Sequence, residues 1–474
     1  MNKSNFINNK WCHSPTGKPF QKVNPANSKV IIFSSLYANA DLSFEAVEAA
    51  NKSWAMWKNI KLNERIEYLN RLIRLLDKNR TQLAEIITLE NGKLFNESLQ
   101  EISASILEGN YQLEFLTNNL IEKVGDHEIR YEPTGSSLLI TPWNFPIATI
   151  LRKLIPTLAL GNTAIVKASE NTPLTSVTLF KIIEEVGFPP GVVNLLNGFG
   201  SELIPQIIKS NKIATISFTG STKNGKKIFR NIGGKLIKYQ AEMGGNNTVL
   251  ILNDSNLDLA ISSVVSNSFA CCGQWCTGTG RILVEEKIFT TFKKKLISAV
   301  NNLNPGNGMD KKSTIGPLIS DSQLLKTNSA VKLAKKNGAE IILGGKRINS
   351  EDLKYGYFYE PTILSNIKDN MQIFDEEIFG PVISIIKVKN AKDGINILNK
   401  SRYGLSFSVY GKNRKILEEI VTKVETGLSH INLPTTYRDV ALPLLGWKDS
   451  GYGIAESGRF ARDFFSRTKA IYRN

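Results

Sequence analysis

Three of the four cysteines in this 474-residue chain lie within the stretch ACCGQWCTGTGR, residues 270–281. Such a cluster fits a metal site, a disulfide or one reactive thiol, and cysteine spacing alone does not decide among them. A zinc site needs four ligands, commonly in paired units, but Cys271, Cys272 and Cys276 have no second cluster to complete one. We therefore expect no metal site and regard a Cys272–Cys276 disulfide as incidental. A nucleophilic Cys276 is favoured, since it lies in a turn before TGTG where backbone N–H groups would lower the pKa of the thiol.

Two further segments carry polar groups suited to carbonyl chemistry. The stretch TPWNFP, residues 141–146, holds Asn144 in an extended turn between two prolines, where its amide could face a ligand. The stretch QAEMGGNN places Glu242 after a strand-like LIKYQ, where a carboxylate could act as a general base. A loop asparagine is usually a turn residue and most glutamates are simply solvated, so the residues alone leave both roles open.

The segment ISFTGSTKNGKK indicates a strand ending at Phe218 and a polar loop that opens a helix. Gly220, Gly225 and Lys226 fit the P-loop pattern, but Lys227 replaces the hydroxyl residue that would bind magnesium. Free backbone N–H groups at a helix start, together with the Ser221 hydroxyl, would still attract phosphate oxygens. A generic tight turn is the alternative.

These segments must be positioned by helices and strands that the apolar pattern predicts. Residues 41–60 and 62–93 have the periodicity of helices, with Asp41 as a cap and Gly92 as a stop. From about residue 137, short apolar runs alternate with amphipathic helices, which predicts a parallel sheet covered on both faces. A second α/β domain is expected from about residue 246. The predicted strands of the two blocks are SLLIT, TAIVKA, VVNLLN, ATISFTG and TVLIL, then RILVEE, EIILGG and ISIIKV.

Composition narrows the class of protein. The chain is 42% hydrophobic and 22% charged, which is typical of globular proteins. Its N-terminus has no apolar signal region, and no run reaches the roughly 18 apolar residues of a membrane helix. The chain has only four cysteines, and their spacing is not that of a disulfide framework, which favours a location in the reducing cytoplasm. The net charge of +16 is spread over scattered lysines without a nucleic-acid motif, so we expect neither a nucleic-acid nor a membrane partner.

Together the motifs resemble the aldehyde dehydrogenase superfamily, in order along nearly the whole chain. The succinate-semialdehyde and α-ketoglutarate-semialdehyde dehydrogenase-like branches are the nearest. The matching pieces are NPANSKVI, TPWNFP, ALGNTAIVKASE, FPPGVVNLLNG, SFTGSTKNG, EMGGN, GQWCTGTGR, EEIFGPV and NLPTTYRDVALPLLGWKDSG.

This resemblance implies a role for each catalytic position. Cys276 would add to the aldehyde carbonyl, and the Asn144 side chain with the Cys276 backbone N–H would hold the oxyanion. The thiohemiacetal would then expel hydride to a nicotinamide, and Glu242 would activate the water that hydrolyses the thioester. Because the acylating branch typically lacks this glutamate, we expect a non-acylating enzyme.

The resemblance also implies the cofactor site. NAD is expected, with NADP as the alternative, because a carboxylate at Glu170 would bind ribose hydroxyls and repel a 2′-phosphate. The implied cofactor-binding residues are Trp143, Lys167, Glu170, Gly220, Ser221, Gly225, Glu377 and Phe379.

For the substrate, Arg152 in TILRK is similar to the carboxylate-anchoring arginine of the semialdehyde branches, while the alternative is a surface arginine on a helix. Ala270 replaces a second anchoring arginine of the succinate-semialdehyde branch, and Arg438 is a candidate replacement. Leu444 and Leu445 depart from the family's Phe-Gly. Trp275 is bulky and narrows the channel, which favours short anionic aldehydes.

We therefore predict an α/β aldehyde dehydrogenase-like fold with a Rossmann-type cofactor domain, an α/β catalytic domain and a small β oligomerisation element. Residues 1–115 and 135–245 would bind NAD, and residues 246–440 would carry the catalytic domain. Residues 116–134 and 455–474 would be oligomerisation strands of a homodimer or homotetramer, or else an ordinary edge hairpin. The rival functions are the same chemistry on neutral or hydroxy-aldehydes, such as lactaldehyde or glyceraldehyde, and a catalytically retired structural or basic binding protein.

Overall fold

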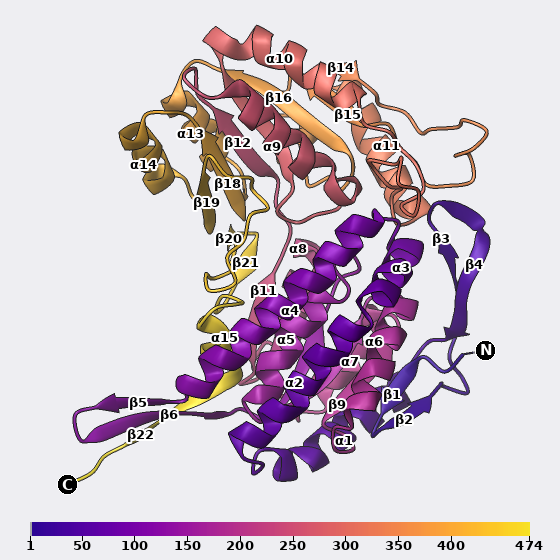
Figure 1. Ribbon diagram of the computed structural model, residues 1–474, viewed down its shortest axis with the longest axis vertical. Coiled ribbons are helices and arrows are strands. Elements are labelled where there is room, and N and C mark those ends of the chain that lie inside the picture. The colour runs from indigo at the N-terminus through magenta and orange to yellow at the C-terminus, as the bar shows by residue number, and fades with distance from the viewer. Residues whose placement is uncertain (1) are drawn as a thin grey trace.

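A computed structural model describes residues 2–474, and its framework consists of two large sheets (Figure 1). The first has eight strands in the order β2-β1-β9-β8-β7-β10-β11-β21. Its five central strands are parallel, and β1 and β21 pair antiparallel at the two sides. The bounds are β1 Asn5–Ile7, β2 Lys10–Cys12, β7 Ser136–Ile140, β8 Thr163–Ala168, β9 Val193–Asn197, β10 Thr215–Thr219, β11 Lys238–Glu242 and β21 Gly451–Tyr452.

Helices cover both faces of this sheet because its strands are apolar on both sides. Leu139 and Val166 pack with α2, α3, α5 and α6 on one face, whereas Leu138 and Ile165 pack with α1, α7 and α8 on the other. The helices are α1 Ala40–Trp57, α2 Leu62–Lys78, α3 Arg80–Asn91, α4 Phe95–Asn118, α5 Ala148–Ala159, α6 Pro173–Val186, α7 Gly200–Lys209 and α8 Thr222–Asn231.

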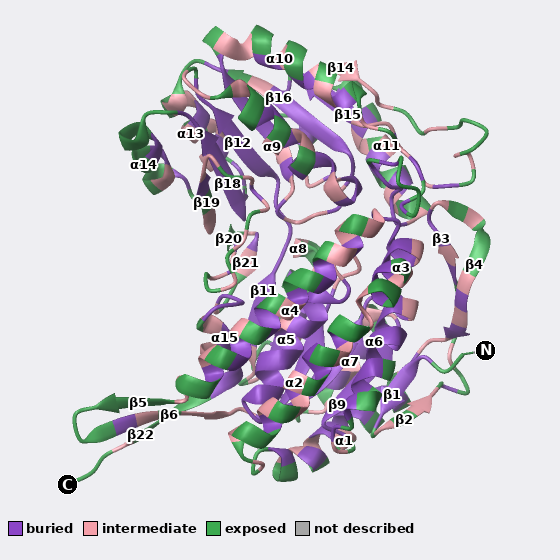
Figure 2. Ribbon diagram, in the orientation of Figure 1, coloured by how far each residue is buried: buried purple, intermediate pink, exposed green. Residues whose placement is uncertain are grey.

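The second sheet has seven strands in the order β14-β15-β16-β13-β12-β18-β19, all parallel except β14. Its strands are β12 Asn247–Ile251, β13 Thr279–Glu285, β14 Glu340–Leu343, β15 Thr362–Ser365, β16 Val382–Val388, β18 Ser406–Tyr410 and β19 Leu428–Ile431. Its helices are α9 Leu257–Phe269, α10 Glu286–Asn301, α11 Asp321–Lys336, α12 Gln372–Asp375, α13 Ala391–Asn399 and α14 Arg414–Lys423. Figure 2 shows the buried strands of both sheets beneath helices that are exposed on their outer sides.

A small third sheet projects from the body, with the C-terminus near its tip (Figure 1). It joins β5 Ile121–Val124, β6 His127–Pro133 and, after α15 Phe460–Phe465, β22 Ser466–Ile471. Ile121 and Val124 are about half exposed there, at 53% and 51%. The two segments predicted to be either oligomerisation strands or an edge hairpin thus pair with each other. The remaining strands are β3 Pro19–Asn24 with β4 Asn27–Leu36, and β17 Tyr403–Gly404 with β20 Trp447–Lys448.

The structure corrects three local predictions. The long helix expected over 62–93 is two helices that meet at Asn79, and the cap of α1 is Asn39, which accepts the Leu42 N–H, rather than Asp41. Strands also form before α1, where the sequence predicted none. Gly92 does end its helix, in the left-handed conformation at φ 92°.

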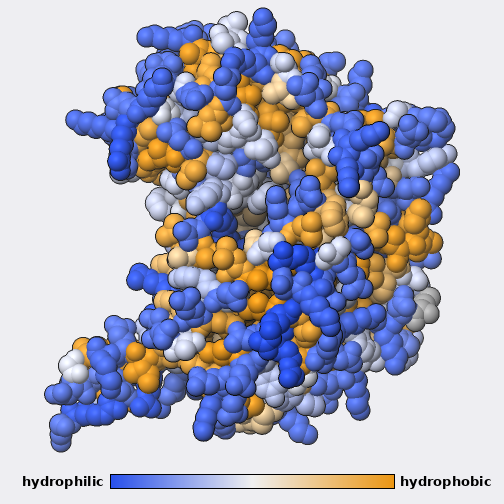
Figure 3. All heavy atoms as spheres, viewed as in Figure 1, coloured by the Kyte–Doolittle hydropathy of each residue, from blue (hydrophilic) through white to orange (hydrophobic). Residues whose placement is uncertain are grey.

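The surface carries no helix that could cross a membrane: within residues 2–474 none is both long and apolar enough. Figure 3 shows hydrophilic side chains distributed over the whole visible face. It also shows a notch between the part of the molecule built on the first sheet and the part built on the second.

Candidate active site

The chain reverses sharply just before Cys276, and this turn separates the three clustered cysteines. Cys271 and Cys272 both adopt left-handed backbone conformations, at φ 50° and 58°, and both are buried. Gly273 follows at φ 69°, and a Cβ there would lie 2.1 Å from the Gly380 carbonyl oxygen. Cys276 is half-buried between this turn and β13, and all four cysteines are free thiols.

Cys276 opens into a cavity of about 760 Å³ that both sheets help to form. The first sheet contributes the segments that follow the carboxyl ends of its parallel strands β7, β10 and β11, where ligands bind in open α/β sheets. The second contributes the cysteine turn and the segment before β16. Ten of the predicted site residues line this one cavity: Trp143, Asn144, Arg152, Gly220, Ser221, Glu242, Trp275, Cys276, Glu377 and Phe379.

Asn144 is held against the backbone that leads to Cys276. Its Nδ2 donates to the Gln274 carbonyl oxygen at 3.0 Å. The backbone carbonyl oxygen of Asn144 accepts a 2.7 Å hydrogen bond from Lys93 Nζ. Asn91 Nδ2 donates to the backbone carbonyl oxygen of Trp143 at 2.8 Å. The amide is therefore fixed next to the reactive turn by residues at the end of α3, so the two prolines are not its only constraint.

A buried ion pair that the sequence did not reveal fixes the same loop. Lys93 Nζ lies 2.8 Å from Glu101, and neither side chain is exposed. The other Glu101 oxygen accepts the backbone N–H groups of Ile147 and Ala148 at the start of α5. A carboxylate placed there is favoured by the helix dipole, so this pair positions both Asn144 and the helix that carries Arg152.

Glu242 ends β11 and is buried, with no hydrogen-bond partner for Oε1 among residues 2–474. Burial and the neighbouring charge of Glu456 raise the pKa of Glu242 well above its usual value. Glu456 itself forms a buried ion pair with Lys153. A carboxyl group with a raised pKa and a free oxygen can accept a proton from water in the cavity.

The thiol of Cys276 has a pKa raised to about 12, mainly by burial and then by the charges of Glu377 and Glu242. Arg152 and Arg438 act in the opposite direction. The sequence predicted a lowered pKa from backbone N–H groups, so that prediction is wrong in direction. Burial and two carboxylates outweigh the effect of the turn.

The raised pKa predicts how Cys276 reacts with iodoacetamide. Because only the thiolate reacts, the alkylation rate should rise about tenfold per pH unit from pH 7 to 9.5 without levelling off. Mass spectrometry of the Cys276 peptide would measure this, with the Cys276→Ala variant as the blank. A rate that reaches a plateau below pH 9 would contradict the raised pKa.

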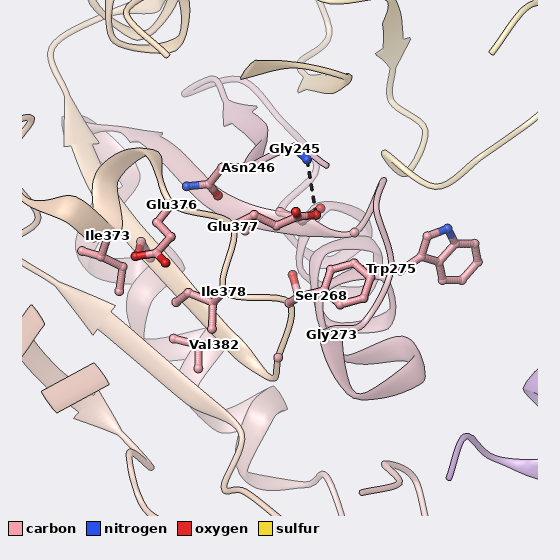
Figure 4. Close-up of a pocket in the computed structure, with 16 residues that line it drawn as sticks. Gly245, Asn246, Ser268, Gly273, Trp275, Ile373, Glu376, Glu377, Ile378 and Val382 are labelled. Carbon is pink, nitrogen blue, oxygen red and sulfur yellow. Dashed lines mark hydrogen bonds between the residues drawn. The ribbon is translucent and has the colours of Figure 1, made fainter. Parts of the chain in front are cut away.

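Glu377 and Phe379 approach the cavity from the segment before β16. Figure 4 shows the Glu377 carboxylate directed toward Gly245, whose N–H it accepts at 3.3 Å. A Cβ on Gly244 would lie 1.9 Å from Glu377 Oε2, so glycine is needed there for this approach. Burial raises the pKa of Glu377 to about 7. This segment also lines a smaller cavity of about 30 Å³. Phe379 packs edge-on against Trp143, with 5.3 Å between ring centroids.

Comparison with known proteins decides the family. A model of the Aldehyde dehydrogenase family matches residues 11–471. The chain belongs to this family. This aldehyde dehydrogenase is 31% identical to "Alpha-ketoglutaric semialdehyde dehydrogenase" of Bacillus subtilis (strain 168), covering 99% of this chain and 97% of that protein. It is 33% identical to "D-glyceraldehyde dehydrogenase (NADP(+))" of Picrophilus torridus, over 90% of this chain and 88% of that protein.

A solved structure agrees. The NAD⁺ complex of aldehyde dehydrogenase from Bacillus cereus has a TM-score of 0.95 and 32% identity, covering 100% of this chain and 97% of that one. The predicted family and α/β fold are therefore confirmed.

The predicted cofactor residues of this dehydrogenase lie in two places. Ser221 caps α8, where its side chain accepts the Asn224 N–H, and it lines the cavity together with Gly220. Gly225 lies in the first turn of α8; a Cβ there would meet Met243 Sδ at 2.5 Å, which indicates close packing of the helix on the sheet.

Lys167 lies near the end of β8 and Glu170 follows this strand; neither residue lines the cavity. Their side chains form an ion pair at 3.0 Å, in which Glu170 remains partly exposed. Cofactor contacts of Lys167, Glu170 and Gly225 stay predictions.

Arg152 is not a surface arginine. Its Nε donates to both oxygens of Glu108, at 3.1 and 3.0 Å, and its side chain is only 14% exposed. Trp275 lines the cavity and packs against Phe145, with ring centroids 4.7 Å apart. Leu444 also lines the cavity, whereas Leu445 is not among its lining residues. Nothing in the sequence pointed to Glu108, because its partner Arg152 lies 44 positions further along the chain.

In the described part of the chain, no three His, Cys, Asp or Glu side chains gather in a way that could hold a metal ion.

Proposed function

We propose that this dehydrogenase oxidises an aldehyde to a carboxylic acid with NAD⁺, through a thioester on Cys276. The carrying observation is that Cys276, Glu242 and Asn144 line the same cavity as Gly220 and Ser221 at the start of α8. An anionic cofactor fits the latter two, because a helix N-terminus and a serine hydroxyl attract phosphate oxygens. Glu377 and Phe379 are available for its ribose and ring.

In the proposed mechanism, the Cys276 thiolate forms a C–S bond to the aldehyde carbon, and the carbonyl oxygen becomes an oxyanion. The Asn144 amide and the Cys276 backbone N–H stabilise that oxyanion. The oxyanion then re-forms the C=O bond as the hydrogen on that carbon leaves as hydride, which leaves a thioester on Cys276; NAD⁺, when bound, would supply the hydride acceptor. Glu242 then takes a proton from the water that attacks the thioester, which releases the acid and restores the thiol. Hydrolysis by water, and not transfer to coenzyme A, is the non-acylating route.

The proposed substrate is a short semialdehyde that carries a carboxylate, such as succinic or α-ketoglutaric semialdehyde. Support comes from Arg152 and Arg438, both of which line the cavity, and from the name of the Bacillus subtilis relative. The second candidate is a small neutral or hydroxy-aldehyde, which the name of the Picrophilus torridus relative favours. A retired binding protein is the non-enzymatic alternative.

The wider assignments are proposals of the same kind. The first sheet, with residues up to 115 and from 135 to 245, would form the cofactor domain, and residues 246–440 the catalytic domain. The projecting sheet would join subunits in a dimer or tetramer, for which the half-exposed Ile121 and Val124 are the support. Four free cysteines support a cytoplasmic location.

A nicotinamide-absorbance assay over a panel of aldehydes tests this function. We expect the highest kcat/KM with carboxylate-bearing semialdehydes, lower values with lactaldehyde and glyceraldehyde, and no reduction with the Cys276→Ala blank. Faster turnover of the neutral aldehydes would favour the second candidate. No cofactor reduction with any aldehyde would favour a retired protein.

The same assay tests the preference for NAD⁺ over NADP⁺. We expect NAD⁺ to be preferred about tenfold or more, because the Glu170 carboxylate would repel a 2′-phosphate. The Glu170→Gln variant, which removes the charge and keeps the shape of the side chain, should lower the ratio of kcat/KM with NAD⁺ to kcat/KM with NADP⁺. Equal or better catalytic efficiency with NADP⁺ in the unmodified enzyme would contradict the proposal.

A further inference from the structure

Two arginines share a single carboxylate at one side of the cavity. Arg152 Nε donates to both Glu108 oxygens, while Arg438 Nη2 lies 3.9 Å from Glu108 Oε1. Ser457 connects the two, since its hydroxyl donates to Glu108 and accepts a 3.0 Å hydrogen bond from Arg438 Nη2. We call Arg152, Arg438, Glu108 and Ser457 the arginine cluster. It contains two positive charges and one negative charge, so it keeps a net positive charge.

Most hydrogen-bond donors of Arg438 are unused. A guanidinium has five N–H donors, and within residues 2–474 Arg438 donates one hydrogen bond, to Ser457. Its Nη1 is buried without a partner among residues 2–474. Leaving a buried charged donor unpaired is costly. An anion bound in the cavity would supply the missing acceptor.

The segment that carries Arg438 is firmly held. His430, on β19, bridges the Phe407 carbonyl oxygen through Nδ1 at 2.8 Å and the Tyr437 carbonyl oxygen through Nε2 at 3.1 Å. This fixes the backbone immediately before Arg438. A preorganised guanidinium loses less conformational freedom when it binds a carboxylate.

The positive charge is not cancelled by the other carboxylates around the two arginines. Glu456, which acts on Arg438, is paired with Lys153, and the pKa of Glu242 is raised well above its usual value. Glu101 is paired with Lys93. Glu97 accepts the backbone N–H groups of Leu94 and Cys271, and burial raises its pKa. Apolar residues also line the cavity, which suits a short hydrocarbon link between a carboxylate and an aldehyde: Leu107, Phe145, Trp275, Val440 and Leu444.

We propose that Arg438 is the residue that binds the substrate's carboxylate, and that Arg152, held by Glu108, is a positioning residue whose charge supports the cluster. This inference rests on the proposed semialdehyde oxidation and changes its anchor from Arg152 to Arg438. Arg438 is thereby the determinant of specificity for anionic over neutral aldehydes of the same length.

The test compares two four-carbon aldehydes, anionic succinic semialdehyde and neutral butanal. For Arg438→Gln we expect the ratio of their kcat/KM values to fall on the order of 10- to 100-fold, mainly through the KM of succinic semialdehyde. Using the ratio removes any effect of the Arg438 charge on the thiol, which both substrates share. Arg438→Lys should keep part of the preference. Arg414→Gln, at a side chain 91% exposed on α14, is the matched control and should keep the full ratio.

A second measurement does not depend on turnover. Succinate should slow alkylation of Cys276 by iodoacetamide in the unmodified enzyme, and this protection should be lost in Arg438→Gln and kept in Arg414→Gln. Thermal unfolding of each variant shows whether it is folded.

The outcomes separate the two proposals. An unmodified enzyme that does not oxidise succinic semialdehyde, while succinate protects it through Arg438, contradicts the proposed substrate and supports the anion site. An enzyme that oxidises succinic semialdehyde with the same ratio in Arg438→Gln overturns the inference. A ratio lost in Arg152→Gln but unchanged in Arg438→Gln overturns it as well and returns the anchor to Arg152.

Discussion

The Cys276→Ala variant is expected to lose aldehyde oxidation by a factor on the order of 10⁴ or more, with no burst of reduced cofactor in the first turnover. An aldehyde has no oxyanion able to expel hydride until a nucleophile adds to its carbonyl carbon. Cys276 is half-buried, lines the cavity and lies next to the Gln274 backbone that Asn144 contacts. Stopped-flow absorbance of the nicotinamide, with enzyme in excess of aldehyde, would measure the loss.

Two other cysteines make this prediction specific. Cys12→Ala removes a thiol on β2 in the first sheet and should keep full activity. Cys271 also lines the cavity, but it lies within the turn and donates its backbone N–H to Glu97 at 2.8 Å. If Cys271→Ala abolished the burst while Cys276→Ala preserved it, the nucleophile would be Cys271 and the assignment would be wrong.

With a pKa raised to about 12, the Cys276 thiol is protonated at neutral pH and is a poor nucleophile. The charges around it indicate which changes would favour the thiolate. Burial, Glu377 and Glu242 raise its pKa, whereas Arg152 and Arg438 lower it. Any step that moves Glu377 away or protonates Glu242 would therefore favour the thiolate. The close approach of Glu377 to the glycines at 244 and 245 is a contact that such a step would have to break.

Much of the fold could be predicted because the two sheets are buried on both faces. A strand between two helix layers must be apolar on both sides, so runs such as TAIVKA stand out, and β8 covers that run from Thr163 to Ala168. The change of sheet near residue 246 was predictable for the same reason. The position of Glu242 could be predicted from the strand before it, since ligand-binding residues collect at strand ends, whereas Asn144 was indicated by the turn between its two prolines.

The remaining features depend on contacts between residues far apart in the chain. Nothing in the sequence near Arg152 shows that Glu108, on α4 in the cavity wall, accepts a hydrogen bond from the Arg152 Nε. The Lys93–Glu101 pair fixes the loop of Asn144 from more than 40 positions upstream. The direction of the Cys276 pKa shift depends on total burial, which local spacing does not report. Among the strands before α1, β1 and β2 have three residues each, too few for a periodic signal, and β1 pairs with the distant β9.

The Glu242→Gln variant is expected to separate the two halves of the reaction. Steady-state kcat should fall on the order of 10³, because a glutamine amide cannot take a proton from the attacking water. The first turnover should still produce about one equivalent of reduced cofactor per Cys276, since thioester formation does not need this base. Rapid-quench mass spectrometry should then find the acyl group on the Cys276 peptide. Loss of the burst together with kcat would show that Glu242 acts before the thioester forms.

The pH dependence of kcat tests the same role of Glu242 without replacing Glu242 itself. Because the pKa of Glu242 is raised, its function as a base is present above that pKa and is lost as the pH falls through it. Glu456 is one of the groups that raise it, so Glu456→Gln should move the acid limb of the kcat profile to lower pH. The variant also leaves Lys153 unpaired, and an ammonium near Glu242 shifts the limb in the same direction. An acid limb that moves to higher pH would show that the limb belongs to a group other than Glu242.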